Sequence, residues 1–303
     1  MLSLRSQMLY PCCPFHSALR CDSMQDAVTT FYRETDWMFR VIGLIRGSTA
    51  MHAGLWGPQA YTHAAALAAL NRDLATRAGL RDGLRLLDAG CGAGSCALWL
   101  ARRYDIHVLG ITLAPGQALQ ATSAAEGDDL ATRARFACLD FARTGLPDAS
   151  FDVIWAVESV CHAPDLAAFL YEARRLLRPG GRLVIADRFR SVRPTDAAGA
   201  AELNIWYRGW ALPGLATIEQ LRSTALAAGF GDLLAEEVTA RAWPSLRFLG
   251  QFAALSLPAA LALRAVGLQS AAQISAIRGC IAQYASLRRG LWGYWLVSAS
   301  AGG

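Results

Sequence analysis

Short apolar runs alternate with amphipathic helical patterns between residues 84 and 190 of this 303-residue chain. Five runs have the length and composition of buried strands. They lie at residues 85–89, 106–111, 134–139, 151–157 and 182–186. Helical patterns lie at 95–103, 115–126 and 165–177, and the last of these ends at a Pro-Gly-Gly sequence. Strands that alternate with helices predict a doubly wound, mostly parallel sheet with helices on its faces.

The two flanking segments have less regular patterns. Residues 25–80 are helical around the turn-rich Gly54-Leu55-Trp56-Gly57-Pro58 sequence, which predicts an N-terminal helical flap. Residues 191–303 combine an aromatic insertion, a helix near 217–228, a long alanine-rich helical stretch and a strand at 291–298. We therefore expect an α/β Rossmann-like core over residues 81–190, followed by a cap and the final strands over 191–303. Residues 1–24 are predicted to be a disordered or non-native extension, with Met24 as the native start.

Composition removes several classes of protein. A hydrophobic content of 54% with 17% charged residues favours a globular enzyme with apolar pockets. Every basic residue is arginine, so Schiff-base enzymes and ATPases with a P-loop lysine are excluded. The net charge of +5 is scattered rather than gathered in a basic stripe, and we expect no nucleic-acid partner. The eight cysteines lack metal-ligand spacing; we expect no metal, reduced thiols and a cytoplasmic location.

The most apolar stretch covers residues 248–263. Gln251 and Pro258 interrupt it, and Arg247 and Arg264 bound it, so we expect no transmembrane segment. A cap helix or a lid over an apolar substrate is the favoured interpretation. Weak contact with a membrane surface is the remaining alternative.

A glycine-rich loop follows the first predicted strand. The sequence Leu86-Leu87-Asp88-Ala89-Gly90-Cys91-Gly92-Ala93-Gly94 leads directly into a helix, where free backbone amides bind anionic groups. Its G-x-G-x-G spacing lacks the third glycine of the dinucleotide fingerprint. The loop therefore favours an S-adenosylmethionine site over an NAD site, and a glycine-rich turn without a ligand is the third possibility.

Three segments carry a resemblance to a known family. The sequence from Leu86 to Gln117 resembles the cofactor-binding half of class I S-adenosylmethionine-dependent methyltransferases. Met51–Gly57 is similar to the His-Gly-aromatic element of the γ-tocopherol methyltransferases, and Glu158–Asp165 is similar to a Glu-x-x-Cys-His-Ala-Pro segment of sterol C-methyltransferases. The resemblance covers roughly residues 28–299. It implies the class I strand order, with the last strand antiparallel, and S-adenosyl-L-methionine as the cofactor.

The resemblance also implies which residues hold the cofactor. Asp88 with Gly90, Gly92 and Gly94 would hold the methionine part; Thr112, Leu113 and Gln117 the ribose; and Asp140 and Phe141 the adenine. The usual acidic residue after the second strand is missing here, which also weakens the NAD interpretation. Ordinary alternatives are a helix-capping Asp88, an exposed Gln117 and a solvent-facing Asp140.

Glu158 and His162 follow the fourth predicted strand and are the candidate catalytic residues. If residues 158–162 form a helical turn, their i,i+4 spacing places both side chains on one face. Methyl transfer needs alignment, and it needs a base only when the acceptor must lose a proton. The alternative is that Glu158 caps a helix or contacts the cofactor while His162 is a packed loop residue.

Aromatic and histidine side chains outside the core are candidates for the acceptor pocket. They are Tyr32, His52, Trp56, Trp206, Tyr207 and Trp210. The alternative is an ordinary cluster that packs the cap. The predicted reaction is methyl transfer to carbon or nitrogen of a small hydrophobic acceptor such as a terpenoid, prenylated quinol or alkaloid, with oxygen less favoured but open. The rivals are an NAD-dependent reductase and a non-catalytic protein that binds a hydrophobic ligand.

Overall fold

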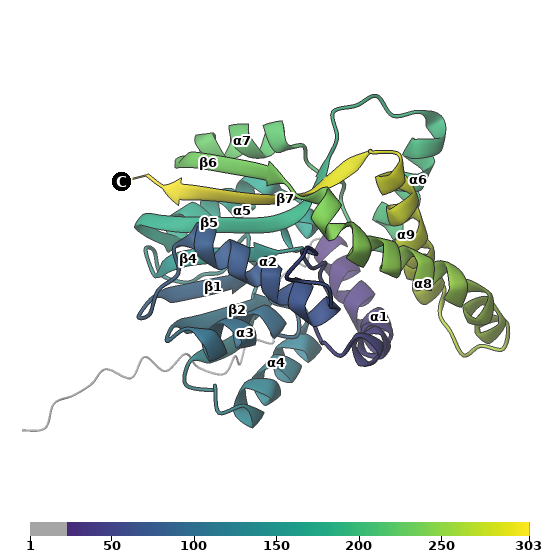
Figure 1. Cartoon of the computed structure of the whole chain (residues 1–303), viewed down its shortest axis with the longest axis horizontal. Helices are drawn as coiled ribbons and strands as arrows, with labels where there is room; N and C mark the ends of the chain where they lie inside the picture. The colour runs from purple at the N-terminus through teal and green to yellow at the C-terminus, as the bar shows by residue number, and fades with distance from the viewer. Residues whose placement is uncertain (1–22, 303) are drawn as a thin grey trace, which may run out of the picture.

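The computed structural model describes residues 23–302, so most of the predicted 1–24 extension lies outside the described residues. A single seven-stranded sheet forms the centre of the molecule, in the order β3-β2-β1-β4-β5-β7-β6 (Figure 1). Its strands are β1 Arg85–Ala89, β2 His107–Thr112, β3 Ala134–Cys138, β4 Phe151–Val157, β5 Leu177–Arg190, β6 Phe230–Glu237 and β7 Trp292–Ala301.

The strand directions confirm the predicted fold class. β1 to β5 pair in parallel, and β7 runs antiparallel between β5 and β6. β5 continues beyond the predicted strand at both ends, and β6 was not predicted at all. β6 is an edge strand in which Leu234 is 65% exposed and Glu236 and Glu237 follow, so its apolar pattern is weak.

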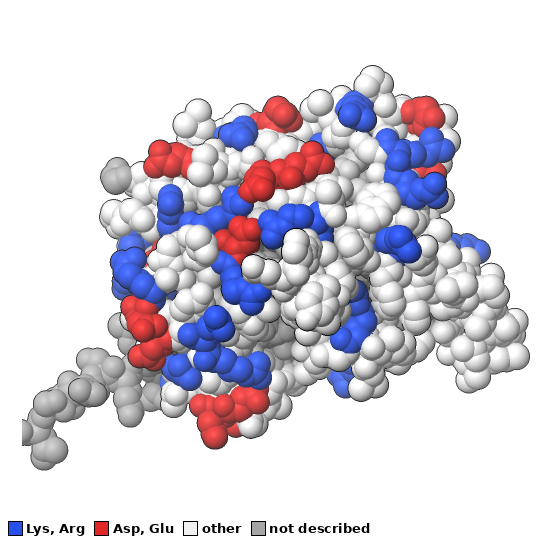
Figure 2. Space-filling view, in the orientation of Figure 1, with Lys and Arg blue, Asp and Glu red and all other residues white. Residues whose placement is uncertain are grey.

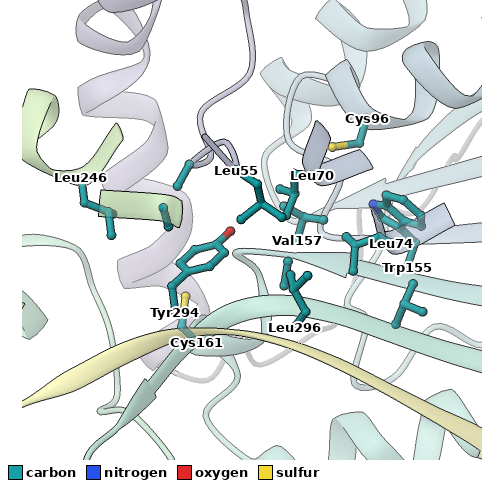
Figure 3. Close-up of a cluster of buried hydrophobic side chains, with 14 of the residues drawn as sticks. Leu55, Leu70, Leu74, Cys96, Trp155, Val157, Cys161, Leu246, Tyr294 and Leu296 are labelled. Atoms are coloured by element: carbon teal, nitrogen blue, oxygen red, sulfur yellow. The ribbon is translucent and has the colours of Figure 1, made fainter. Parts of the chain in front are cut away.

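Helices cover both faces of the sheet because neighbouring strand residues point to opposite sides. Leu86 packs with the face covered by α2 (His63–Ala78), α3 (Ser95–Arg103) and α4 (Pro115–Gly127), whereas Leu87 packs with α5 (Leu166–Leu176) and α7 (Ile218–Ala227). Figure 3 shows part of the first cluster, in which Leu70 and Leu74 lie near Trp155 and Leu296. Both faces are therefore buried, as a mostly parallel sheet requires.

The remaining long helices lie beyond the carboxyl ends of the parallel strands (Figure 1). They are α1 (Ser23–Arg46), α6 (Ala197–Gly209), α8 (Thr239–Ala265) and α9 (Ala271–Arg288). In an open α/β sheet this end holds the ligand. The helices therefore stand where a cap over a binding site would stand.

α8 contains the most apolar stretch of the sequence. It is one continuous helix of 27 residues that contains both Pro244 and Pro258. Arg247 and Gln251 also lie within it. Among the described residues it is the one helix long and apolar enough to cross a membrane by length and composition, and 22% of its most apolar window is buried. The helix expected from the sequence is confirmed, and its relation to a membrane stays a prediction.

Candidate active site

The glycine-rich loop turns sharply between β1 and α3. Gly90 has φ +93°, and a Cβ there would lie 2.3 Å from the Cβ of Ser159. Gly94 has φ +83°, and a Cβ there would lie 2.8 Å from the Cβ of Ala121. Both positions need glycine for the conformation and for close packing. Gly94 itself does not line the cavity described next, although its neighbours Ala93 and Ser95 do, and its role in cofactor binding stays a prediction.

A cavity lies between this loop and the helices beyond the sheet. It holds about 1180 Å³ of empty space, including its opening to solvent. Most of the residues predicted to form the site line it: Tyr32, His52, Asp88, Gly90, Gly92, Thr112, Leu113, Gln117, Asp140, Phe141, Glu158, His162 and Trp210. The structure thus brings the candidate cofactor and catalytic residues to one place, although their individual roles stay predictions.

Three predicted acceptor residues do not line this cavity. The indole N–H of Trp56 donates to Ser245 Oγ at 2.9 Å, which holds the ring against α8. Trp206 is fully buried in the core and packs on Trp292 at 4.9 Å between ring centroids. Tyr207 packs on Trp206 instead of facing the ligand space. The aromatic insertion is a helix, α6, and its period directs these rings into the cap.

Asp88 is the polar group on the loop that most needs a partner. Its side chain is buried, lines the cavity, and has one oxygen, Oδ2, without a hydrogen-bond partner in the described part of the chain. Burial raises the pKa of Asp88 to about 7. A cationic donor would relieve this desolvation. The amino group of an S-adenosyl amino acid has that charge and chemistry, so the residues present fit the cofactor.

Further along the same side of the cavity, polar and aromatic groups follow β2 and β3. Thr112 Oγ1 donates to Gln117 Oε1 at 3.1 Å, which orients the amide group. Gln117 is buried rather than exposed, which corrects the ordinary alternative. Asp140 and Phe141 line the cavity, and Phe141 packs edge-to-face on Phe169 at 5.3 Å. We call the residues from Asp88 to Phe141 that line the cavity the glycine-loop side.

Glu158 reaches the cavity by a different backbone path from the predicted helical turn. It has φ +51°, a strained conformation for a residue with a side chain, and a short 3₁₀ helix, η1 (Val160–His162), follows it. Its Oε1 accepts from the backbone N–H of Ala53 at 2.7 Å, and its Oε2 accepts from the guanidinium of Arg188. Both oxygens are engaged, so Glu158 holds the site together and is poorly placed to accept a proton.

Arg188 was missed by the sequence reasoning. It is buried, lines the cavity, pairs with Glu158, and lies over the ring of Trp210 at 5.6 Å. The neighbouring Asp187 accepts from the backbone N–H of Cys161 at 2.9 Å, and burial raises its pKa to about 6. Asp187 and Arg188 directly follow the predicted apolar strand at 182–186. Two adjacent charged residues at that position could have indicated a buried polar site.

His162 lies in the same polar cluster. Its Nε2 is 3.2 Å from the hydroxyl of Tyr32 on α1. Burial, with the positive charge of Arg188, lowers the pKa of His162 to about 4, so the ring is neutral at pH 7 and a ring nitrogen can accept a hydrogen bond. Burial raises the pKa of Tyr32, which keeps its hydroxyl protonated. Tyr32, Glu158, His162, Arg188 and Trp210 are called the His162 side below.

His52 connects the two sides. Its Nδ1 lies 2.9 Å from the Ala53 carbonyl, and its Nε2 lies 3.3 Å from the thiol of Cys96 at the start of α3. Burial lowers the pKa of His52, as expected for a neutral, hydrogen-bonded ring. The segment that carries His52 also supplies the Ala53 amide to Glu158. His52 therefore fixes this segment over the cavity.

Comparison with known proteins agrees with this architecture. The family model described as a methyltransferase domain matches residues 87–185. The chain is 34% identical to the 27-O-demethylrifamycin SV methyltransferase of Amycolatopsis mediterranei (strain S699) over 64% of this chain and 71% of that protein. It is 36% identical to the 2-methyl-6-phytyl-1,4-hydroquinone methyltransferase of Synechocystis, over 54% of this chain and about half (51%) of that protein.

Solved structures show the same fold over most of the chain. The [4+2]-cyclase SpnF superposes with a TM-score of 0.74 and 28% identity, over 91% of this chain and 95% of that one. The cyclopropane synthase MmaA2 of Mycobacterium tuberculosis has a TM-score of 0.75 at 19% identity, over 91% and 98% of the two chains. The fold is that of the class I methyltransferases.

The 27-O-demethylrifamycin SV methyltransferase, matched over 71% of its length, shows the family to which this chain belongs. The chain belongs to the S-adenosylmethionine-dependent methyltransferases, and S-adenosylmethionine is its methyl donor. This confirms the resemblance seen in the sequence and excludes the alternative that the chain is an NAD-dependent reductase.

Proposed function

We propose that this chain methylates a small, largely apolar natural product that carries an ionisable hydroxyl group, such as a phenol or prenylated quinol. The observation that carries the proposal is the Tyr32–His162 pair in the wall of the cavity. Once its proton leaves, such an acceptor can be methylated at oxygen or at a ring carbon. The sequence favoured carbon or nitrogen as the methylated atom and left oxygen open; the proposal keeps carbon, places oxygen beside it and does not favour nitrogen.

The glycine-loop side supports the cofactor's position. Asp88 would pair with the amino group of the cofactor, and the loop at Gly90 and Gly92 leaves its backbone open toward the cavity. Thr112 and the oriented amide of Gln117 supply polar groups where a ribose would need them. When bound, S-adenosylmethionine supplies a methyl group on positively charged sulfur, and transfer of the methyl removes that charge.

The His162 side supports proton removal from the acceptor. A tyrosine hydroxyl can donate to one group while its oxygen accepts from another. Tyr32 can therefore donate to His162 Nε2 and accept from the acceptor hydroxyl, which gives the proton a path to the imidazole. A neutral imidazole can take up this proton as the new methyl bond forms.

The relatives support the class of acceptor. Proteins similar to this chain are named for a rifamycin, for a phytyl hydroquinone and for tocopherol. Trp210 and Val28 give the cavity apolar wall, while the buried Arg188 is held by Glu158. An apolar scaffold with one polar reacting group matches this lining.

The test is methyl transfer from labelled S-adenosylmethionine to pairs of acceptors that differ in one group. Each phenolic or quinol compound is compared with its methyl ether, in which the ionisable hydroxyl is blocked. We expect product only from the free hydroxyl compound. Equal labelling of compounds without an ionisable hydrogen would contradict the proposal.

Two variants test the residues. His162→Ala should lower kcat about 100-fold, and Tyr32→Phe, which removes only the hydroxyl, should lower it about 10-fold. Calorimetry with S-adenosylhomocysteine should give the wild-type affinity for both. A His162→Ala variant with full turnover would remove the base assignment.

A second candidate activity follows from the similarity to the [4+2]-cyclase SpnF, which is 28% identical over most of both chains. The same apolar cavity could fold a polyene for cyclisation without methyl transfer. In that case S-adenosylhomocysteine would bind, labelled methyl would not be transferred to any acceptor, and conjugated polyenes would cyclise in the presence of the protein.

A further inference from the structure

The charges of this chain are distributed very unevenly along its length. All 24 acidic residues lie at or before Glu237, so the last 66 residues contain none. The same 66 residues carry six arginines: Arg241, Arg247, Arg264, Arg278, Arg288 and Arg289. The rest of the chain holds the other 23 arginines and is nearly neutral. The net positive charge therefore comes entirely from the part that forms α8, α9 and β7.

This positive part includes an apolar projection, which we define as residues 255–271. It comprises the far half of α8 and the turn into α9, and it stands out from the body of the protein (Figure 1). Leu255 is 82% exposed, Val266 70% and Leu268 72%. Figure 2 shows the end of this region as white surface, in contrast to the mixed charges over the sheet. Exposed apolar residues gathered in this way mark a contact surface.

Three arginines lie on or beside the projection. Arg208 of α6, Arg264 of α8 and Arg278 of α9 line one shallow depression together with Ile205 and Ile274. None of the three belongs to an ion pair among the described residues, whereas Arg241 and Arg289 pair with acidic side chains. No acidic residue lines the depression. The three guanidinium groups are therefore available to an anion such as a phosphate group.

From this combination we propose that the projection docks on an anionic phospholipid surface. The exposed leucine and valine side chains would enter the interface between headgroups and acyl chains, and the three arginines would contact lipid phosphates. Glu34 is the acidic side chain that reaches this region, and it is bonded to the Ser270 hydroxyl at 2.7 Å. It brings one negative charge beside three arginines, so the region keeps an excess of positive charge.

The geometry favours docking on a lipid surface over two alternatives, a membrane-spanning helix and a contact with a second copy of the chain. Sixteen residues lie between Arg247 and Arg264, and as a helix they span about 24 Å, less than the ~30 Å hydrocarbon core of a bilayer. The near half of α8 also packs inside the protein, through Ala242, Leu246 and Ala253. A two-fold contact with a second copy would bring arginines against arginines, because this part has no acids.

Vesicle sedimentation with the full chain tests the proposal. We expect binding to vesicles of phosphatidylcholine with 30% phosphatidylglycerol, about tenfold weaker binding to pure phosphatidylcholine, and loss of the difference in high salt. Arg264→Glu with Arg278→Glu should weaken binding to the anionic vesicles more than tenfold. Val266→Ser with Leu268→Ser should weaken binding to both vesicle types.

A matched control changes the same charge elsewhere. Arg81→Glu with Arg135→Glu alters exposed arginines near the amino ends of β1 and β3, far from the projection. This control should bind anionic vesicles nearly as well as wild type, and every variant should keep its affinity for S-adenosylhomocysteine. Absence of vesicle binding, or equal loss in the control, would overturn the proposal. So would a dimer in light scattering that Val266→Ser with Leu268→Ser converts to a monomer.

Discussion

The glycine-loop side is centred on one strand-to-helix loop, from Asp88 to Gly94, whereas the His162 side gathers side chains from Tyr32 on α1 to Trp210 after α6. The loop is shaped by local backbone geometry and by glycines that allow close approach to Ser159 and Ala121. The His162 side depends on a buried ion pair between β4 and β5 and on a helix from the other end of the chain. We therefore expect substitutions in the loop to act mainly through its backbone, and substitutions on the His162 side to act through the packing of the cap.

Removing Arg188 should have the largest effect and should act on the His162 side. Arg188→Ala leaves Glu158 and Asp187 buried without their cation, and we expect the free energy of unfolding to fall by about 3–5 kcal/mol in denaturant titrations. The double variant Glu158→Gln with Arg188→Met leaves fewer unpaired charges and should lose less. Equal losses in the two proteins would show that the pair does not hold this side together.

A single added methyl group at Gly90 should disrupt the conformation of the glycine-rich loop. Gly90→Ala introduces a Cβ 2.3 Å from Ser159, at a positive φ, and should cost about 3 kcal/mol and weaken S-adenosylhomocysteine binding. Gly92→Ala is the matched control, since its nearest neighbour is the flexible end of Met51 at 3.3 Å, and it should cost about 1 kcal/mol. If both variants unfold at the same denaturant concentration, the close approach to Ser159 is unimportant.

The two sides should respond to acid with opposite signs. The pKa of Asp88 is raised to about 7 when folded, so between pH 7 and 5 its protonation stabilises the free protein by about 2 kcal/mol. The pKa of His162 is lowered to about 4, so over the same range protonation of the unfolded chain destabilises the protein by about 2 kcal/mol.

Two variants separate these contributions in unfolding curves measured at each pH. Asp88→Asn should make the protein more sensitive to acid than wild type, and His162→Gln should make it less sensitive. Parallel pH profiles for wild type and both variants would show that neither group titrates as the structure indicates.

The smallest effect concerns a residue that the sequence placed in the acceptor pocket and the structure does not. Trp56→Phe removes one hydrogen bond to Ser245 and should cost about 1 kcal/mol without changing the acceptor KM. Trp210→Phe changes the wall of the cavity and should raise that KM. A raised KM for Trp56→Phe alone would restore the sequence-based assignment.

The same contrast explains what the sequence could predict. The strands and the residues from Asp88 to Phe141 follow each other at strand ends, so local patterns place them at one edge of the sheet. The partners of Glu158 come from segments that no local pattern connects to it, namely Ala53 and Arg188. The rings of Trp206 and Trp56 were misplaced because composition shows aromatic character but not the direction in which a helix or loop presents it.

The central claim is that Asp88 pairs with the charged amino group of the cofactor. The most direct measurement is calorimetric titration of the protein with S-adenosylhomocysteine between pH 8 and pH 6. Because the free Asp88 has a pKa of about 7 and must be ionised to bind the amino group, we predict about tenfold weaker binding at pH 6 than at pH 8. Asp88→Asn should bind weakly with no such dependence, and an equal pH dependence in both proteins, or wild-type affinity in the variant, would contradict the account.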